Sequence, residues 1–109
     1  MKHRSHLSPK QRKARSKLAK IAHEKGFVRG TIITMSRVCG NPNCRCAKGQ
    51  KHVSLYLSRS EGGKPKLLFI PKRYEEMVKG WVDNHRHIKE LLEEVSLDLW
   101  DGIKQRRFD

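Results

Sequence analysis

All three cysteines of the chain fall within eight residues, at Cys39, Cys44 and Cys46, and His52 follows shortly after them. An odd number of cysteines cannot pair completely into disulfides, and Cys44 and Cys46 are too close in sequence to bridge without strain. A tetrahedral zinc ion takes four nitrogen or sulfur ligands, and three cysteines with one histidine are a recurrent structural set. The spacing C-x4-C-x-C-x5-H therefore predicts a zinc knuckle held by these four residues. Four protein ligands leave no open position for catalysis.

Two alternatives to this zinc site stay open: a reduced thiol cluster in a basic loop, and a metal site completed by a partner chain. Metal is favoured because free cysteines are usually buried and scattered rather than clustered. The fourth ligand also has competitors, since five further histidines could donate a ring nitrogen. These are His3, His6, His23, His85 and His87.

Charge is distributed unevenly along the 109 residues. Residues 1–72 hold 18 Lys and Arg against two Glu, a net charge of +16, whereas residues 73–109 hold seven against nine acidic residues, a net charge of −2. A segment this basic attracts polyanions and releases their counterions on binding, so nucleic acid is the expected partner. An anionic membrane is less favoured because the basic segment lacks large apolar and aromatic residues to insert.

The composition, 36% hydrophobic and 33% charged, predicts one small domain with a thin core that a bound metal would help to stabilise. The first residues are polar and basic, and no run of eighteen apolar residues occurs. The sequence thus predicts neither an export signal nor a membrane span. Clustered thiols without an export signal predict a cytoplasmic protein.

Local patterns predict an α+β fold: a basic helix, a three-stranded antiparallel meander with the zinc knuckle between its first two strands, and a long C-terminal helix. Ser8, Pro9 and Gln11 form a helix start with a capping box, for a helix from Pro9 to about Lys25, with a glycine stop after it. β-branched and alternating apolar residues predict the strands. The strands are expected over residues 27–38, 53–58 and 66–70. The three segments of this single compact domain are 1–26, 27–72 and 73–109.

Apolar residues recur at steps of three and four from Met77 to Leu99, which predicts a helix of about thirty residues from about Arg73 toward Ile103. Such a helix is longer than the small sheet can cover. The uncovered half either frays or bends back near Ser96, or it forms a coiled-coil or helical-hairpin contact with a second copy or a protein partner. The candidate interface residues are Ile88, Leu91, Leu92, Val95, Leu99 and Trp100.

Four pieces of the sequence belong to one recognisable pattern: Val38 to Ala47, His52, Leu57-Ser58 and Ile70-Pro71-Lys72. Together they resemble a domain of unknown function in small prokaryotic proteins, which is often found with mobile elements and transposase-related genes. Its pattern is a C-G-x-P-x-C-x-C-A core, an H-G-P-aromatic-aromatic-L-S strand and a closing helix rich in Leu and Glu. The chain departs from it at Val53-Ser54, where the family has Gly-Pro, and at Tyr56, which alone represents the aromatic pair. The resemblance covers about residues 16 to 103; it implies a mobile-element context and assigns no reaction.

These observations predict a small zinc-stabilised nucleic-acid-binding protein, an accessory subunit of a nucleoprotein complex of mobile-element type. Most contacts are expected at phosphates, with Arg37 and Arg45 the best candidates for base-specific contact. RNA is slightly favoured over DNA because neither helix has the short polar side chains of a recognition helix. The predicted contact residues are Lys10, Arg12, Lys13, Arg15, Lys17, Lys20, Arg37, Arg45, Lys48 and Lys51.

The main alternative function is a protein-interaction adaptor that binds a transposase, nuclease or ribosomal assembly through the C-terminal helix. An enzyme with a small-molecule substrate is not expected. A metal-dependent nuclease needs carboxylates converging on an open site, and only Glu24 and Glu61 precede the last helix. A cysteine nucleophile with His52 as its base would lose both groups to the metal.

Overall fold

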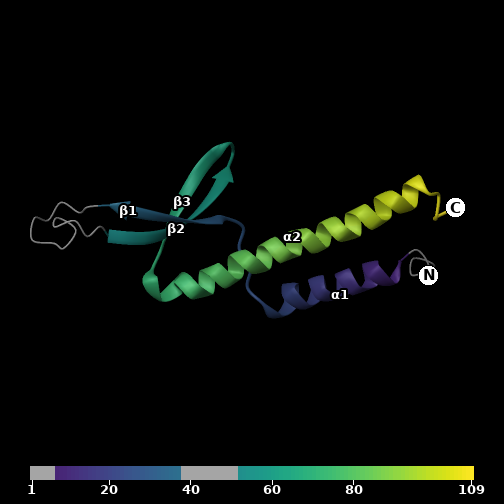
Figure 1. The fold of residues 1–109 in the computed structure, drawn as a ribbon, viewed down its shortest axis with the longest axis horizontal. Helices are drawn as coiled ribbons and strands as arrows, with labels where there is room; N and C mark the ends of the chain where they lie inside the picture. The colour runs from purple at the N-terminus through teal and green to yellow at the C-terminus, as the bar shows by residue number, and fades with distance from the viewer. Residues whose placement is uncertain (1–6, 38–51) are drawn as a thin grey trace, which may run out of the picture. The chain divides into compact units, whose positions relative to one another are not determined.

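The computed structural model describes residues 7–37 and 52–109, with the backbone alone at Arg37 and His52. The fold is α+β, as predicted, with an N-terminal helix, a three-stranded antiparallel sheet and a long C-terminal helix (Figure 1). The elements in chain order are α1 (Pro9–Glu24), β1 (Thr31–Arg37), β2 (His52–Glu61), β3 (Lys64–Ile70), the short 3₁₀ helix η3 (Lys72–Tyr74) and α2 (Glu75–Lys104).

The chain divides into two compact units, each with its own small core. Residues 28–82 form the sheet unit, and the residues before 28 join those after 82 in the helical unit. Helix α2 contributes its first residues to the sheet unit and its remainder to the helical unit. Neither of the two described helices combines the length and the hydropathy that a membrane crossing needs.

Helix α1 begins with half of the predicted capping box. The Ser8 hydroxyl accepts a hydrogen bond from the Gln11 amide at 3.0 Å, and Pro9 occupies the first turn, where its missing N–H is not needed. The Gln11 side chain does not complete the box: it is 1% exposed and lies on the buried face of the helix. At the other end the helix stops at Lys25, which is extended, and the predicted stop residue Gly26 follows without a positive φ.

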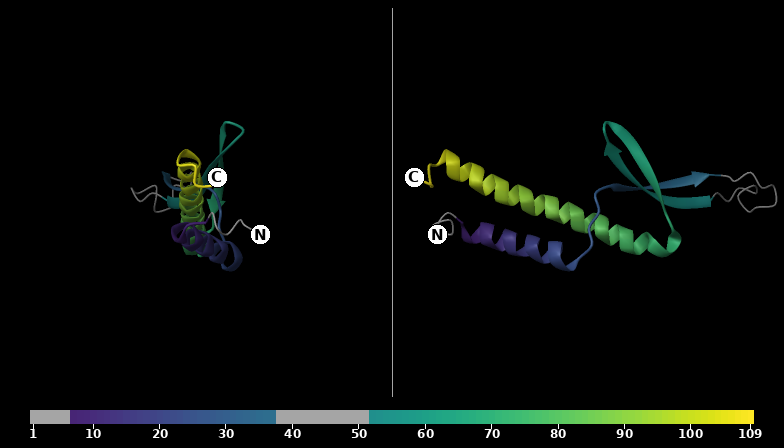
Figure 2. Two further views of the ribbon diagram at one scale, coloured as in Figure 1. Left: turned by 90° about the vertical axis from the view of Figure 1, so that its right-hand side faces the viewer. Right: turned by 180° about the vertical axis from the view of Figure 1, so that it is seen from behind.

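The helical unit is an antiparallel pair made by α1 and the second half of α2, as the views in Figure 2 show. At one end Gln11 Nε2 donates to Asp98 Oδ2 at 2.7 Å. At the other end Asn84 Nδ2 donates to the carbonyl oxygen of Gly26 at 2.8 Å. The apolar core between these bonds consists of Ala14, Ile21, Ile88 and Leu91, with Leu18 and Val95 at its margin. Helix α1 therefore covers the part of α2 that lies beyond the sheet unit.

Helix α2 runs without a break through Ser96, and its length agrees with the sequence prediction. It ends in a Schellman motif. The Arg106 amide donates to the Ile103 carbonyl oxygen at 3.2 Å, and the Arg107 amide donates to the Gly102 carbonyl oxygen at 2.9 Å. Arg106 has a φ of 57°, at the position where glycine is the usual residue.

The sheet unit has strand order β1-β2-β3, with both pairs antiparallel. Gly62 and Gly63, both with positive φ, form the two-residue turn between β2 and β3, as a type I′ hairpin requires. This turn is shorter than the predicted one, so β2 and β3 each extend further toward it. The core of the unit joins one face of the sheet to the start of α2. It consists of Leu57, Ile70 and Val82, with Val28, Ile32, Leu55 and Val78 packed against them.

The register leaves the outer part of the β2–β3 hairpin without a third strand. Strand β1 pairs with residues 52–58 of β2, whereas β3 pairs with residues 55–61. The predicted first strand is also shortened at its start, because the Val28 amide donates to the Trp81 carbonyl oxygen at 3.1 Å instead of joining the sheet. The hairpin end beyond residue 58 therefore has no third strand on the side where β1 begins.

Candidate functional site

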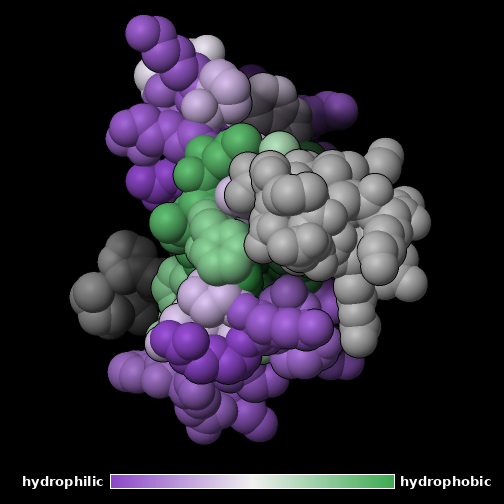
Figure 3. All heavy atoms as spheres, turned by 90° about the vertical axis from the view of Figure 1, so that its left-hand side faces the viewer, coloured by the Kyte–Doolittle hydropathy of each residue, from purple (hydrophilic) through white to green (hydrophobic). Residues whose placement is uncertain are grey.

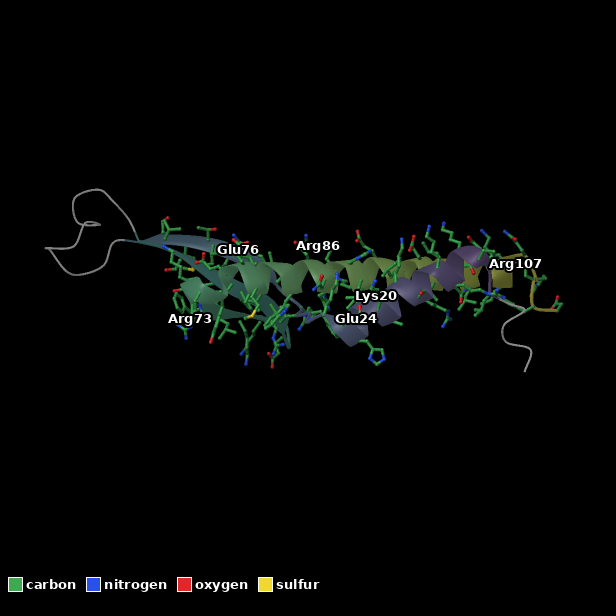
Figure 4. The ribbon with its side chains drawn as sticks, turned by 90° about the horizontal axis from the view of Figure 1, so that it is seen from below. Lys20, Glu24, Arg73, Glu76, Arg86 and Arg107 are labelled. Carbon is green, nitrogen blue, oxygen red and sulfur yellow. The ribbon has the colours of Figure 1, made fainter. Side chains whose placement is uncertain are left out.

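The cationic residues of α1 lie on its exposed surface. Its apolar face packs into the helical core, and the cations occupy the remaining faces of the helix. Figure 4 shows the side chains along both helices, with Lys20 and Glu24 labelled on α1. The exposed cations are Lys10, Arg12, Lys13, Arg15, Lys17 and Lys20, all six of those predicted in this segment. Glu24 is the one acidic residue of the helix.

Within the described ranges 7–37 and 52–109, four of these cations have no carboxylate in ion-pair distance: Lys10, Lys13, Lys17 and Lys20. The fold therefore does not use them to hold α1 in place. That role falls to the apolar core and to Gln11, whose side chain bonds Asp98 and accepts a hydrogen bond from Arg15 Nε at 2.7 Å. The four lysines lie on a helix that is held by its apolar core and by the bonds of Gln11, and we call these four residues the α1 lysine row.

The predicted zinc ligands are placed only in part. Cys39, Cys44 and Cys46 lie outside the described residues, as do Arg45, Lys48 and Lys51. Arg37 and His52 are partners in the ladder between β1 and β2, so the intervening segment starts and ends at adjacent strand positions. Three cysteines and one histidine are a donor set that suits zinc. In the described part of the chain no group of three His, Cys, Asp or Glu side chains could hold a metal.

The candidate interface residues of α2 fall into two groups. Ile88 and Leu91 are buried against α1, and Val95 lies at the margin of the same core. Leu92 and Trp100 are exposed, and Leu99 is half-buried. Two further exposed apolar residues, which the sequence prediction did not include, are Leu97 and Ile103. Packing against α1 thus accounts for Ile88, Leu91 and Val95, and it leaves Leu92 and Trp100 exposed.

The sheet unit contains a groove that sequence reasoning missed. Two adjoining cavities, of about 340 and 330 Å³, share Val28, Leu57 and Leu68 in their walls, and we call them together the sheet groove. The cationic end is further lined by Arg29, Arg59, Lys66 and Leu67. The apolar end is further lined by Phe69, Ile70, Pro71, Tyr74, Met77, Val78 and Trp81.

Much of the apolar surface near this groove is open. Leu68 is the ladder partner of the buried Leu57, yet it is one of the most exposed apolar residues of the unit. Figure 3 shows hydrophobic residues gathered in a continuous region on one side of the molecule. The signal that could have located the groove is the alternation of Leu55, Leu57 and Arg59 on one face of β2, opposite Lys66 in β3. This face changes from apolar to cationic toward the end of the hairpin.

A family model for a domain of unknown function, DUF6788, matches residues 7–79, two thirds of the chain. The chain therefore belongs to the DUF6788 family, and the expectation of a family without an assigned function is confirmed. The matched range includes α1, the three strands and the start of α2. Neither a curated protein nor a solved structure matches the chain.

Proposed function

We propose that this protein binds nucleic acid, RNA in preference to DNA, and that α1 lies along the phosphate backbone. The observation that supports this most directly is the α1 lysine row, whose four cations lack carboxylate partners among the described residues. Like charges on one helix repel one another, and phosphates bound beside the lysines would offset this repulsion by attracting each of them. Base edges are not required for such contacts, so α1 supplies affinity more than sequence specificity.

In this proposal zinc stabilises the segment that carries further cations. Cys39, Cys44, Cys46 and His52 would hold the ion, whose role is structural because four protein ligands complete its coordination. Arg45 falls between two of the ligands in sequence, and Lys48 and Lys51 follow them. The mobile-element context remains part of the proposal: the protein would be an accessory subunit that binds the nucleic acid of such a complex.

A pair of charge-matched variants tests the role of α1. In the first, the four residues of the α1 lysine row are changed to Gln, which keeps a similar helix propensity. In the second, four cations of α2 are changed to Gln instead: Lys79, Arg86, Lys89 and Lys104. Two of these α2 residues already pair with acids, Lys79 with Glu76 and Arg86 with Asp83. Both variants lose the same net charge, so a difference between them cannot arise from net charge.

Fluorescence anisotropy with labelled single-stranded RNA, an RNA hairpin and duplex DNA measures the outcome. Each phosphate contact on a single strand contributes a slope of about −0.7 to the logarithm of the association constant against the logarithm of salt concentration. At 0.1 M salt, the loss of four such contacts should therefore weaken binding on the order of 10³-fold. The α2 variant should bind nearly as the unchanged protein does. Equal losses in both variants would mean that net charge alone attracts the polymer and that α1 is not its binding surface.

A second function, as a protein-interaction adaptor, is supported by the exposed apolar residues of α2. Leu92, Leu97, Trp100 and Ile103 each expose more than half of their surface. A contact through these residues would bury apolar area and depend little on salt. Analytical ultracentrifugation of the protein alone and with Trp100→Ala measures self-association through this surface, and an unchanged monomer in both removes the support for a homodimer.

A further inference from the structure

We propose that the sheet groove binds an unpaired nucleotide of a single-stranded nucleic acid, with its phosphate at the cationic end and its base at the apolar end. This inference rests on the proposed nucleic-acid binding and adds a second contact, in the sheet unit, that selects unpaired strands. The α1 lysine row would hold phosphates of any nucleic acid, whereas the groove requires a base that is free to leave its stack.

The cationic end brings together side chains from three parts of the chain. Arg59 and Lys66 are ladder partners across the hairpin. Arg29, which precedes β1, donates from Nη2 to the Ser60 carbonyl oxygen at 3.1 Å, so its guanidinium is held over the same strand. A planar guanidinium offers paired donors that match phosphate oxygens.

One acidic residue competes with a phosphate at this end. Glu61 lies 3.0 Å from Arg59 and 3.9 Å from Lys66, measured between the charged nitrogen and carboxylate oxygen atoms. With Arg29 included, these four side chains carry three positive charges and one negative charge, a net charge of +2. The Arg59, Glu61 and Lys66 side chains are about half exposed or more, so solvent screens the pairs and an arriving phosphate can displace the carboxylate. Glu61 therefore acts as a weak internal substitute for the anion.

The apolar end offers flat surface and adjoins the cationic end, with which it shares Val28, Leu57 and Leu68. Tyr74 and Trp81 line it together with Met77, and Leu68 connects it to the cationic end. The Arg73 guanidinium lies 4.7 Å from the centre of the Tyr74 ring, which adds a cation at this end as well. Every base has a flat face that can stack on aromatic side chains, so the contact tolerates different sequences.

A nucleotide matches the chemistry of both ends, because one sugar joins its anionic phosphate to its flat base. A fatty acid would satisfy the apolar end and only one of the cations. A duplex keeps its bases stacked inside and could offer phosphates alone. An acidic peptide with an aromatic side chain is the strongest competitor on charge, and it is included as an arm of the experiment.

Trp81 provides a direct readout, because the chain has only two tryptophans, Trp81 and Trp100. In the Trp100→Phe variant, Trp81 fluorescence should be quenched by a short single-stranded oligoadenylate. An abasic strand with the same number of phosphates and a duplex should bind through α1 without quenching. Equal quenching by the abasic strand would overturn the inference, as would quenching by an acidic aromatic peptide when oligoadenylate has no effect.

Substitutions at the cationic end give effects of opposite sign. Arg29→Gln should weaken binding of oligoadenylate about fivefold at 0.1 M salt, the effect of one phosphate contact. Glu61→Gln should tighten binding, because it removes the carboxylate that competes with the phosphate for Arg59 and Lys66. Exposed pairs add little stability, so circular dichroism should show both variants folded. Oligoadenylate binding could depend on the α1 lysine row without quenching Trp81 fluorescence and without responding to Glu61→Gln. In that case the groove inference is wrong and the proposed function stands. If no nucleic acid binds, both are wrong.

Discussion

Burial of Leu91 against α1 leads to a sharp prediction about the helical unit. Leu91 is 3% exposed, whereas its neighbour Leu92 on the same helix is 52% exposed. Changing each to Ala alters the helix propensity by the same amount. The two variants therefore differ only in the packing that each removes, and Leu92→Ala is the matched control for Leu91→Ala.

The magnitude follows from the size of the core. Replacing a buried Leu by Ala removes about 2–5 kcal/mol of unfolding free energy, with the lower values at sites that can collapse. Among the described residues, the helical core has four buried apolar members, two of them on α1. A thin core relaxes easily, so we expect a loss of about 3 kcal/mol for Leu91→Ala and less than about 1 kcal/mol for Leu92→Ala. Small domains have about 5–15 kcal/mol in total, so the first loss is large.

Urea unfolding followed by circular dichroism at 222 nm measures both variants at a fixed zinc concentration. Leu91→Ala should lower the unfolding midpoint clearly with an unchanged slope, and amide hydrogen exchange should become faster in residues 9–24. Equal midpoints for the two variants would refute the packing of α1 on α2. Faster exchange in both variants alike would refute it too.

Three further predictions concern local structure and metal. A Cβ at Gly30 would lie 2.7 Å from Leu57 Cδ1, so Gly30→Ala should lower the unfolding free energy by about 1–3 kcal/mol, and an unchanged thermal midpoint would contradict this close approach. Arg106→Gly should raise the stability by about 0.5–1 kcal/mol because the residue has a φ of 57°, and a lower melting temperature would argue against the Schellman motif. Elemental analysis should find about one zinc per chain, which Cys44→Ser should lose together with the fold, whereas a metal-free folded protein would contradict the zinc assignment.

The elements of the fold could be predicted because each has a strong local pattern. The cap at Ser8 and Pro9 marks the start of α1, and the apolar repeat marks α2 to within two residues at its start. What the sequence did not reveal was that the two helices cover each other. Both apolar stripes are narrow, and nothing in their spacing says whether the partner is the sheet, a second copy or the other helix.

Gln11 was predicted as part of the helix cap, but its side chain has a packing role instead. Its position in the capping box explained a polar residue at the helix start. The same position lies three residues before Ala14 on the face that packs against α2, so the side chain enters the core and bonds Asp98. A helical projection would have placed it there, but only the structure supplies its partner.

The sheet groove was missed because it depends on strand register. Arg59 and Lys66 are seven residues apart, and the tight turn at Gly62 and Gly63 fixes the register in which they are partners. The broader turn expected from the sequence would have left that register undefined. The α1 cations, by contrast, were predicted as a group because one exposed helix holds them all.

The salt dependence of binding to single-stranded RNA tests the central claim most directly. The account predicts that the logarithm of the association constant falls linearly with the logarithm of salt concentration, with a slope of about −0.7 for each phosphate contact. Replacing the α1 lysine row by Gln should reduce the slope by about three, the sum of four contacts. The charge-matched α2 variant should keep the slope of the unchanged protein. A flat dependence in the unchanged protein, or equal reductions in the two variants, would contradict the assignment of α1 as the phosphate-binding surface.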